Sequence, residues 1–365
     1  MYDMRTHFPG LIYRQPQRFA TTDVHFTPIV QCDKSARLLS GERLATMRCL
    51  NTYARHSRLL SPGAVPFNRM VSSGYFMSKA RFASFWHGPD LSPYELACLR
   101  SFTAYGNEVA LYSYHEVKNL PKGVVAKDAS VILSSDSLND FPIHGVPSMA
   151  HFTDYFRFEM FTKTDEIWVD TDMLLLRDFD LALAGDLIGK ESPTSICTAL
   201  LRLDPANARL KDLIRRVEAM KGTNINWGDT GPRLLTSVYG VKAGLPESVF
   251  YPVHFDDYYK VFLPKYMDEC SALCKSAYTL HLWNNRVVKM GLFKRIGPPA
   301  GSFLHHVFAT LGANSLFRDF YPASVMETMI DNAVQKVGRD EGVRKLLQVG
   351  VPLVKTAIGR RLRPQ

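Results

Sequence analysis

Residues 152–172 read as a short aromatic-rich helix followed by a short buried strand that ends in two aspartates. The strand, Ile167–Val169, leads directly into Asp170-Thr171-Asp172. Such a strand would carry both carboxylates to the edge of a sheet. Hard carboxylate oxygens there suit Mg²⁺ or Mn²⁺, which usually bind a few protein oxygens plus the phosphates of a substrate. The segment therefore predicts an α/β sheet with a metal–diphosphate site at its edge.

A second triplet of the same kind, Asp178-Phe179-Asp180, follows closely. No apolar strand precedes it, so we expect no metal site there. In the first triplet, two like charges so close together would tend to raise the pKa of one carboxyl when no cation is bound.

The residues before this segment predict strand–helix–strand order. Phe82–Trp86 is a short apolar strand, and Ser92-Pro93 begins a helix that ends at Gly106, with Pro at the first helical position and Gly as the C-cap. Glu108–Tyr114 alternates as a second strand. This order favours a mostly parallel sheet flanked by helices. We also expect a short strand at Ser130–Leu133.

Ligands in such folds bind at the carboxyl ends of the strands. Trp86 and His87 end the first strand, so both are candidate nucleotide contacts, although an aromatic residue at a strand end often belongs to the core. A helix over about 151–162 places Asp154 and Arg157 three residues apart on one face. Taken alone, this spacing favours an ordinary intrahelical ion pair, worth ~0.3–0.5 kcal/mol.

Two later polar stretches could close over a ligand. The loop Asn226–Pro232 opens a helix, and free N–H groups at a helix start can bind an anion; a plain connection is the alternative reading. Residues 278–283 alternate as a strand that carries His281, and a single strand histidine is more often structural than a metal ligand.

Charge is spread unevenly along the 365 residues, whose formal net charge is +9. Residues 1–76 carry ten basic residues against four acids, and residues 336–365 carry eight against two. Basic ends suit an anionic membrane surface or nucleic acid, or they are solvated tails without a partner. The apolar runs are shorter than the ~20 residues of a membrane span, no signal peptide is recognisable, and the six cysteines form no CxxC pair. We therefore expect reduced thiols in a cytoplasmic protein, with peripheral contact at the inner face of a membrane.

A set of motifs in a fixed order resembles the DXD-containing sugar transferases of glycosyltransferase family 32 and the related glycolipid α-galactosyl- and α-N-acetylglucosaminyl-transferases. The likeness covers about residues 80–310, and FWHGPDLSPYELACLRSF resembles the first strand and helix of bacterial members. The motifs are Asp154…Arg157…Asp170-Thr171-Asp172, then Thr230-Gly231-Pro232…Leu235-Thr236, then His281-Leu282-Trp283-Asn284.

The resemblance implies a GT-A fold and a retaining reaction that moves a sugar from a nucleotide-diphosphate donor, a UDP-sugar, to a hydroxyl of a glycan or a lipid-linked saccharide. It implies that Asp170 and Asp172 contact Mn²⁺ or Mg²⁺ and the donor, with His281 near the metal. Asp154 and Arg157 would approach the donor sugar or its phosphates. Asp229 would contact the sugar or the acceptor.

The implied chemistry is stabilisation of negative charge on the leaving diphosphate by the metal and Arg157. No carboxylate stands out in the sequence as a nucleophile, so delivery of the acceptor on the leaving-group face is our hypothesis. The chain divides into a basic, poorly ordered extension at 1–78, a GT-A-like catalytic domain at 79–310 and a basic helical tail at 311–365.

Two other functions fit parts of the pattern. An apolar strand followed by DxD also opens haloacid-dehalogenase-type phosphatases, but Leu174 stands where those proteins have Thr or Val. A non-catalytic binding protein would use the basic ends on a membrane or on nucleic acid, and the aspartates would be structural. The positive charge belongs to the ends and not to the presumed catalytic body. We expect peripheral contact with an anionic membrane and no binding of nucleic acid.

Overall fold

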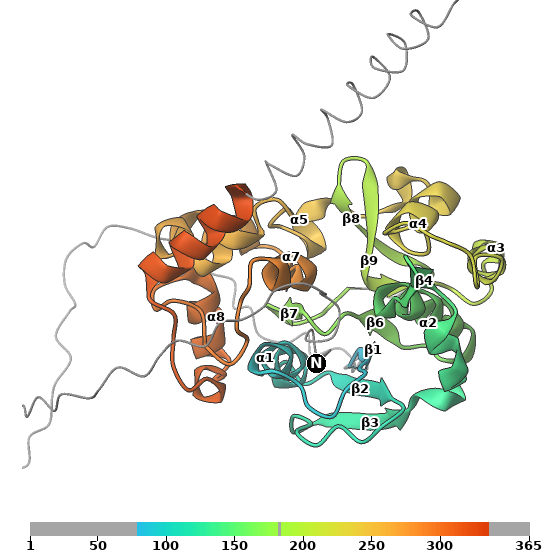
Figure 1. The fold of residues 1–365 in the computed structure, drawn as a ribbon, viewed down its shortest axis with the longest axis horizontal. Coiled ribbons are helices and arrows are strands. Elements are labelled where there is room, and N and C mark those ends of the chain that lie inside the picture. The colour runs from blue at the N-terminus through green and yellow to red at the C-terminus, as the bar shows by residue number, and fades with distance from the viewer. Residues whose placement is uncertain (1–78, 182–183, 336–365) are drawn as a thin grey trace, which may run out of the picture. The chain divides into compact units, whose positions relative to one another are not determined.

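The computed structural model describes residues 79–181 and 184–335 (Figure 1). The expected extension at 1–78 and the tail residues after 335 lie outside the described residues. The division of the chain into three parts therefore remains a prediction.

The centre of the fold is a six-stranded sheet with the strand order β3-β2-β1-β6-β9-β8 (Figure 1). Four neighbouring strands are parallel, as predicted, and they are β3 (Val124–Asp128), β2 (Glu108–Ser113), β1 (Arg81–Phe85) and β6 (Ile167–Val169). An antiparallel hairpin completes the sheet, with β9 (Ser195–Arg202) against β6 and β8 (Leu187–Ser192) outermost. The predicted mostly parallel α/β sheet is confirmed.

The predicted strand at Ser130–Leu133 is wrong. Residues Ala129–Val131 form a 3₁₀ turn instead, and the strand of this region is β3, immediately before it. The Asp128 side chain accepts a hydrogen bond from the Ser130 N–H at 2.8 Å. This local cap satisfies a backbone donor that a strand would need for its ladder, so the strand ends there.

Helices cover both faces of the sheet. Ile167 and Val169 point into one hydrophobic core and Trp168 into the other, as the two-residue period of a strand requires. The first core is covered by α1 (Pro93–Ala104) and α8 (Phe303–Thr310), and the second by α2 (Met149–Lys163), α3 (Ala208–Glu218) and α4 (Pro232–Tyr239) (Figure 1). A sheet buried on both faces explains why its inner strands are almost wholly apolar.

A second, two-stranded ladder positions the site. Strand β7 (Met173–Leu175) pairs antiparallel with β10 (Thr279–His281), and His281 lies opposite Met173. This pairing brings a residue from late in the chain beside the aspartates that follow β6.

The other labelled strands and α-helices are short. They are β4 (Pro142–Ile143), β5 (Val146–Pro147), α5 (Glu247–Phe250), α6 (Met267–Cys274) and α7 (Asn284–Lys289). Residues 323–335 are helical, and Phe317, Met326 and Ile330 belong to the same core as α1, so packed structure continues past residue 310. Within the described ranges no helix is both long enough and apolar enough to cross a membrane.

Candidate active site

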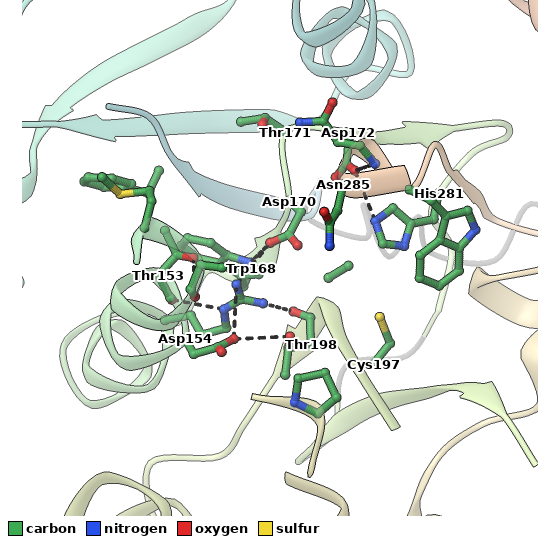
Figure 2. A pocket seen from close by; sticks show the side chains of 18 of the residues that line it. Thr153, Asp154, Trp168, Asp170, Thr171, Asp172, Cys197, Thr198, His281 and Asn285 are labelled. Atoms are coloured by element: carbon green, nitrogen blue, oxygen red, sulfur yellow. Dashed lines mark hydrogen bonds and ion pairs between the residues drawn. The ribbon is translucent and has the colours of Figure 1, made fainter. Parts of the chain in front are cut away.

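A cavity of about 530 Å³ opens where β1 and β6 end, with β9 as a further wall. Figure 2 shows Asp170 and Asp172 on one side of this cavity and Cys197 and Thr198, from β9, across from them. Its size is in the range of small-molecule sites. Parallel strands place their carboxyl ends at one edge of a sheet, which is where α/β folds bind ligands.

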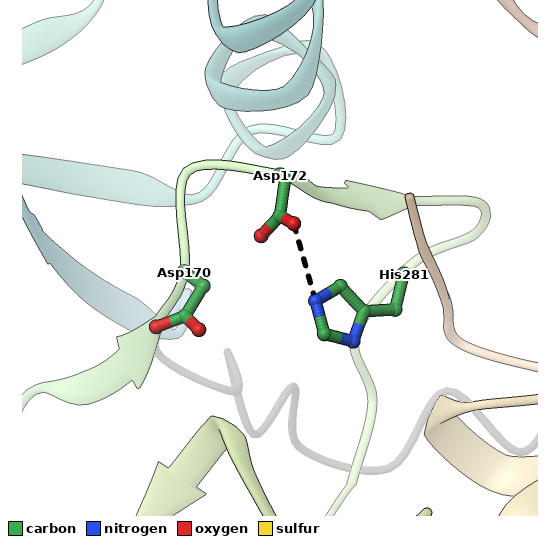
Figure 3. Close-up of side chains that lie close together, drawn as sticks. All are labelled: Asp170, Asp172 and His281. Carbon is green, nitrogen blue, oxygen red and sulfur yellow. Dashed lines mark ion pairs between the residues drawn. The ribbon is translucent and has the colours of Figure 1, made fainter. Parts of the chain in front are cut away.

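Asp170, Asp172 and His281 converge in this cavity, and each offers a ligand atom within 4.8 Å of the others (Figure 3). The Asp172 carboxylate lies 3.2 Å from His281 Nε2 and accepts a hydrogen bond from the Asn284 N–H at 2.7 Å. Trp168 Nε1 donates to Asp170 at 2.6 Å. Two carboxylates and an imidazole in this arrangement suit a divalent cation.

The pKa values of Asp170 and Asp172 are shifted in opposite directions. Burial and the charge of Asp172 raise the pKa of Asp170 to about 6, although Arg157 opposes the change. Burial would also raise the pKa of Asp172, but the charge of His281 and the N–H of Asn284 lower it to about 2. The sequence-based expectation that one carboxyl would titrate high agrees with this difference.

His281 also fits a metal site. Burial lowers the pKa of His281, but the nearby Asp172 charge outweighs burial, and the net pKa lies above its usual value. Its Nδ1 atom is buried and has no hydrogen-bond partner among the described residues. Nε2 is the ring nitrogen that faces Asp172, so Nε2 and the two carboxylates are the donor set that fits a bound cation.

We expect Mn²⁺ to stabilise the protein more at neutral pH than in mild acid. A cation must displace the protons held by Asp170 and His281, whose pKa values are both raised, so affinity should rise as the pH increases through about 6. At about 100 times its dissociation constant a ligand adds ~2.7 kcal/mol to the free energy of unfolding. The thermal shift with Mn²⁺ should therefore be several degrees at about pH 7.5 and clearly smaller at about pH 5.5. An equal shift at both pH values would contradict this assignment.

Arg157 lies at the centre of a buried polar network. Its guanidinium is 3.3 Å from Asp170 and 3.5 Å from Asp154, donates to the Thr198 carbonyl oxygen, and lies over the Trp168 ring at 4.7 Å (Figure 2). The Arg157 side chain is only 3% exposed. The intrahelical ion pair that the spacing favoured is therefore present, but it is buried, and a buried pair depends on every partner for its stability.

Asp154 connects this network to the loop before α4. Its carboxylate accepts hydrogen bonds from the hydroxyls of Thr230, at 2.9 Å, and Thr198, at 3.4 Å. Burial raises the pKa of Asp154, with Arg157 opposing. The next loop residue, Gly231, packs so closely that a Cβ there would lie 2.7 Å from the carboxyl carbon of Asp154.

Gly231→Ala should therefore displace Asp154 and, through it, Arg157. Overpacking of this kind costs about 1–3 kcal/mol, and we expect activity to fall further than stability because the network reaches Asp170. Thermal unfolding and turnover of a nucleotide sugar measure the two effects. Gly222→Ala is the matched control, since its φ of +69° strains the backbone but a Cβ there meets nothing within 4 Å. Equal effects of the two substitutions would contradict the role of close packing.

The other sequence-predicted residues are placed as follows. Trp86 and His87 line the cavity, and Trp86 Nε1 and His87 Nδ1 are buried without partners among the described residues. Burial and the neighbouring His115 lower the pKa of His87. The structure does not bring Asp229 to the cavity: its carboxylate accepts from the Asn226 N–H at 2.8 Å and pairs with Arg233 at 3.2 Å.

The second triplet also lies apart from the cavity lining. Asp178 is 76% exposed and pairs with Lys79, and Asp180 accepts a hydrogen bond from the Tyr278 hydroxyl. Sequence reasoning missed several cavity residues, which are Glu191, Cys197 and Thr198 on the hairpin and Asn285 and Arg286 on α7. Nothing in the local sequence shows which of these side chains face a cavity.

The family model and the curated relatives that match this chain are glycosyltransferases. Residues 219–295 match a family model described as the alpha 1,4-glycosyltransferase conserved region. The chain is 28% identical over 150 residues to the lactosylceramide 4-alpha-galactosyltransferase of Rattus norvegicus and 26% identical over 151 residues to that of Homo sapiens. Each alignment covers 37% of this chain and 41% of the relative, so less than half of each relative's length is matched.

Among solved structures, the bifunctional glycosyltransferase WbbM is 13% identical, with a TM-score of 0.39 over 66% of this chain and 51% of that chain. The PaToxG glycosyltransferase is 12% identical, with a TM-score of 0.33 over 44% of this chain and 68% of that chain. The predicted resemblance to glycosyltransferases, including glycolipid α-galactosyltransferases, is confirmed by the family model and the curated relatives. The likeness to bacterial members stays a prediction. The matched region contains His281 and the loop before α4 but begins after Asp172.

Proposed function

We propose that this chain, which carries an alpha 1,4-glycosyltransferase conserved region, is a metal-dependent retaining glycosyltransferase. Its donor is a UDP-sugar, and its acceptor is a hydroxyl of a glycan or a lipid-linked saccharide. The observation that carries the proposal is the convergence of Asp170, Asp172 and His281 in one cavity, with the buried Arg157 against Asp170.

Different residues along the edge of the sheet would bind different parts of the donor. Trp86 and His87, which directly follow β1, line the cavity and would contact the nucleoside. Asp170, Asp172 and His281 would hold Mn²⁺ or Mg²⁺, which neutralises charge on the diphosphate when bound. Arg157 fixes the orientation of Asp170 and adds positive charge close to the leaving group.

Retention is proposed to follow from delivery of the acceptor on the face that the diphosphate leaves. The acceptor proton would then pass to a diphosphate oxygen as the new glycosidic bond forms and the old one breaks. The matched relatives are named lactosylceramide 4-alpha-galactosyltransferases. UDP-galactose and an alkyl lactoside are therefore the first donor and acceptor to test.

The basic ends support a proposal on location. We propose a cytoplasmic protein whose residues 1–76 and 336–365 contact the anionic inner face of a membrane, where a lipid-linked acceptor lies. Sedimentation with anionic vesicles should fall when 336–365 are deleted and when salt is raised. Unchanged sedimentation of the shortened chain would contradict the role of this segment.

A panel of UDP- and GDP-sugars, with and without Mn²⁺, tests the function. We expect one UDP-sugar to be hydrolysed slowly in a metal-dependent manner, and transfer to octyl lactoside to give an α-linked product by NMR. Metal-independent behaviour without donor binding would favour a non-catalytic protein. Phosphate release from a simple phosphoester, with no use of any nucleotide sugar, would favour a phosphatase-like hydrolase.

A further inference from the structure

Four carboxylates line the cavity, and one of them differs from the rest. Asp154 and Asp170 pair with Arg157, and Asp172 pairs with His281. Within residues 79–181 and 184–335, Glu191 forms no salt bridge, although its charge helps to raise the pKa of His281. Its carboxylate accepts one hydrogen bond, from the Ser195 hydroxyl at 2.7 Å, so most of its acceptor capacity remains available to a ligand.

An irregularity in the β8–β9 hairpin explains how Glu191 reaches the cavity. Lys190 lies opposite Ile196 and Ser192 lies opposite Ser195, so Glu191 is an extra residue on β8 between these pairs. A bulge of this kind interrupts the alternation of a strand and redirects a side chain, often beside a functional site. Ser195, on the partner strand, then holds the carboxylate.

The order of strands shows which part of a donor Glu191 would meet. Along the sheet, the polar ends of β1 and β6 are followed by β9 and then β8. A nucleotide sugar that places its nucleoside at β1 and its diphosphate at β6 would therefore extend its sugar toward the hairpin. Glu191 and Cys197, one from each strand of the hairpin, both line the cavity.

We infer that Glu191 binds hydroxyls of the sugar that is transferred and that Ser195 positions its carboxylate. This inference rests on the proposed function and deepens it. Sugar hydroxyls are donors, and an ionised carboxylate with free lone pairs is their natural acceptor. The same negative charge would face the positive charge that builds on the sugar as its bond to the diphosphate breaks.

Calorimetric titration with UDP and with the UDP-sugar that the panel selects, both with Mn²⁺, tests this role. Glu191→Gln should weaken the binding of the UDP-sugar about tenfold or more, the scale of a hydrogen bond to a charged group, and leave the affinity for UDP unchanged. Ser195→Ala should weaken the binding of the UDP-sugar by a smaller factor. Glu108→Gln is the matched control, because Glu108 is exposed at the start of β2, away from the cavity.

The outcomes separate this inference from the proposed function. Equal weakening of UDP and of the UDP-sugar by Glu191→Gln would assign Glu191 to the diphosphate or to folding and overturn the inference. Unchanged binding of both would also overturn it. A wild-type protein that binds no nucleotide sugar would instead contradict the proposed function, and this inference with it. Glu191→Ala, titrated at a temperature at which it and the wild type are both folded, should also bind the UDP-sugar more weakly and bind UDP with unchanged affinity.

Discussion

Asp172→Ala should abolish turnover of the nucleotide sugar while the protein remains folded. Asp172 offers one of three potential metal ligands, and its carboxylate also contacts His281 and accepts a hydrogen bond from the Asn284 N–H. Removing one group that stabilises developing charge typically lowers turnover about 10²–10³-fold, and loss of a metal ligand should cost at least that. Mn²⁺ should no longer raise the unfolding temperature.

Some stability will also be lost. The substitution leaves the Asn284 N–H and the His281 ring without their acceptor, at a cost of about 1–3 kcal/mol. Because the pKa of Asp172 is lowered in the folded state, its ionised form stabilises the protein above its unfolded pKa, and this contribution disappears as the pH falls toward about 2. The destabilisation should therefore be present in full at neutral pH.

The second DxD triplet supplies the control. Asp180→Ala removes an aspartate with the same sequence context, two residues after another aspartate, but outside the cavity lining. Its turnover and its response to Mn²⁺ should match the wild type. If Asp172→Ala retains substantial turnover, or if Asp180→Ala loses as much, the metal–diphosphate role of the first triplet is wrong.

The sequence predicted those parts of the site that depend on local pattern. An apolar run ending in Asp170 and Asp172 identifies a strand and its polar end within a few residues. His281 is remote in sequence, and only the order of motifs shared with other transferases associated it with the metal. Its actual position depends on the pairing of β7 with β10, which no local pattern specifies.

The position of Glu191 in the cavity could not be predicted from the sequence. Its role depends on an extra residue in an antiparallel hairpin and on the place of that hairpin at the end of the strand order. Register is set by contacts between distant residues, and a shift of one residue moves a side chain to the other face. The wrong strand at Ser130–Leu133 has the opposite origin, since a local cap at Asp128 outweighed the apolar residues that follow.

Substitution of Arg157 should give the largest change in the free energy of unfolding. The spacing of Asp154 and Arg157 was visible in the sequence, but their burial was not. Arg157→Ala would leave Asp154 and Asp170, which are 8% and 30% exposed, without their cation. Removing one partner of a buried ion pair costs about 3–5 kcal/mol. Arg157→Lys keeps the charge but cannot reach both carboxylates and the Thr198 carbonyl oxygen together, so it should lose activity at a smaller cost in stability.

The pH dependence distinguishes lost charge pairing from lost packing. Arg157 lowers the pKa of both Asp154 and Asp170, so without it the two carboxyls bind protons more tightly in the folded state. Protonation removes the uncompensated charge, and the destabilisation should shrink as the pH falls from neutral to below about 6. Denaturant unfolding at the two pH values measures this difference.

Arg216→Ala is the matched control for this measurement, because it breaks an exposed helical ion pair with Asp212 at 2.8 Å. Exposed pairs contribute little, so its effect should be small. A destabilisation by Arg157→Ala that is no larger than this control, or that does not change with pH, would contradict the charge network. Because Asp170 belongs to both the Arg157 network and the metal group, the same substitution should also alter the affinity for Mn²⁺. One buried cation thereby couples the stability of α2 to the chemistry at the end of β6.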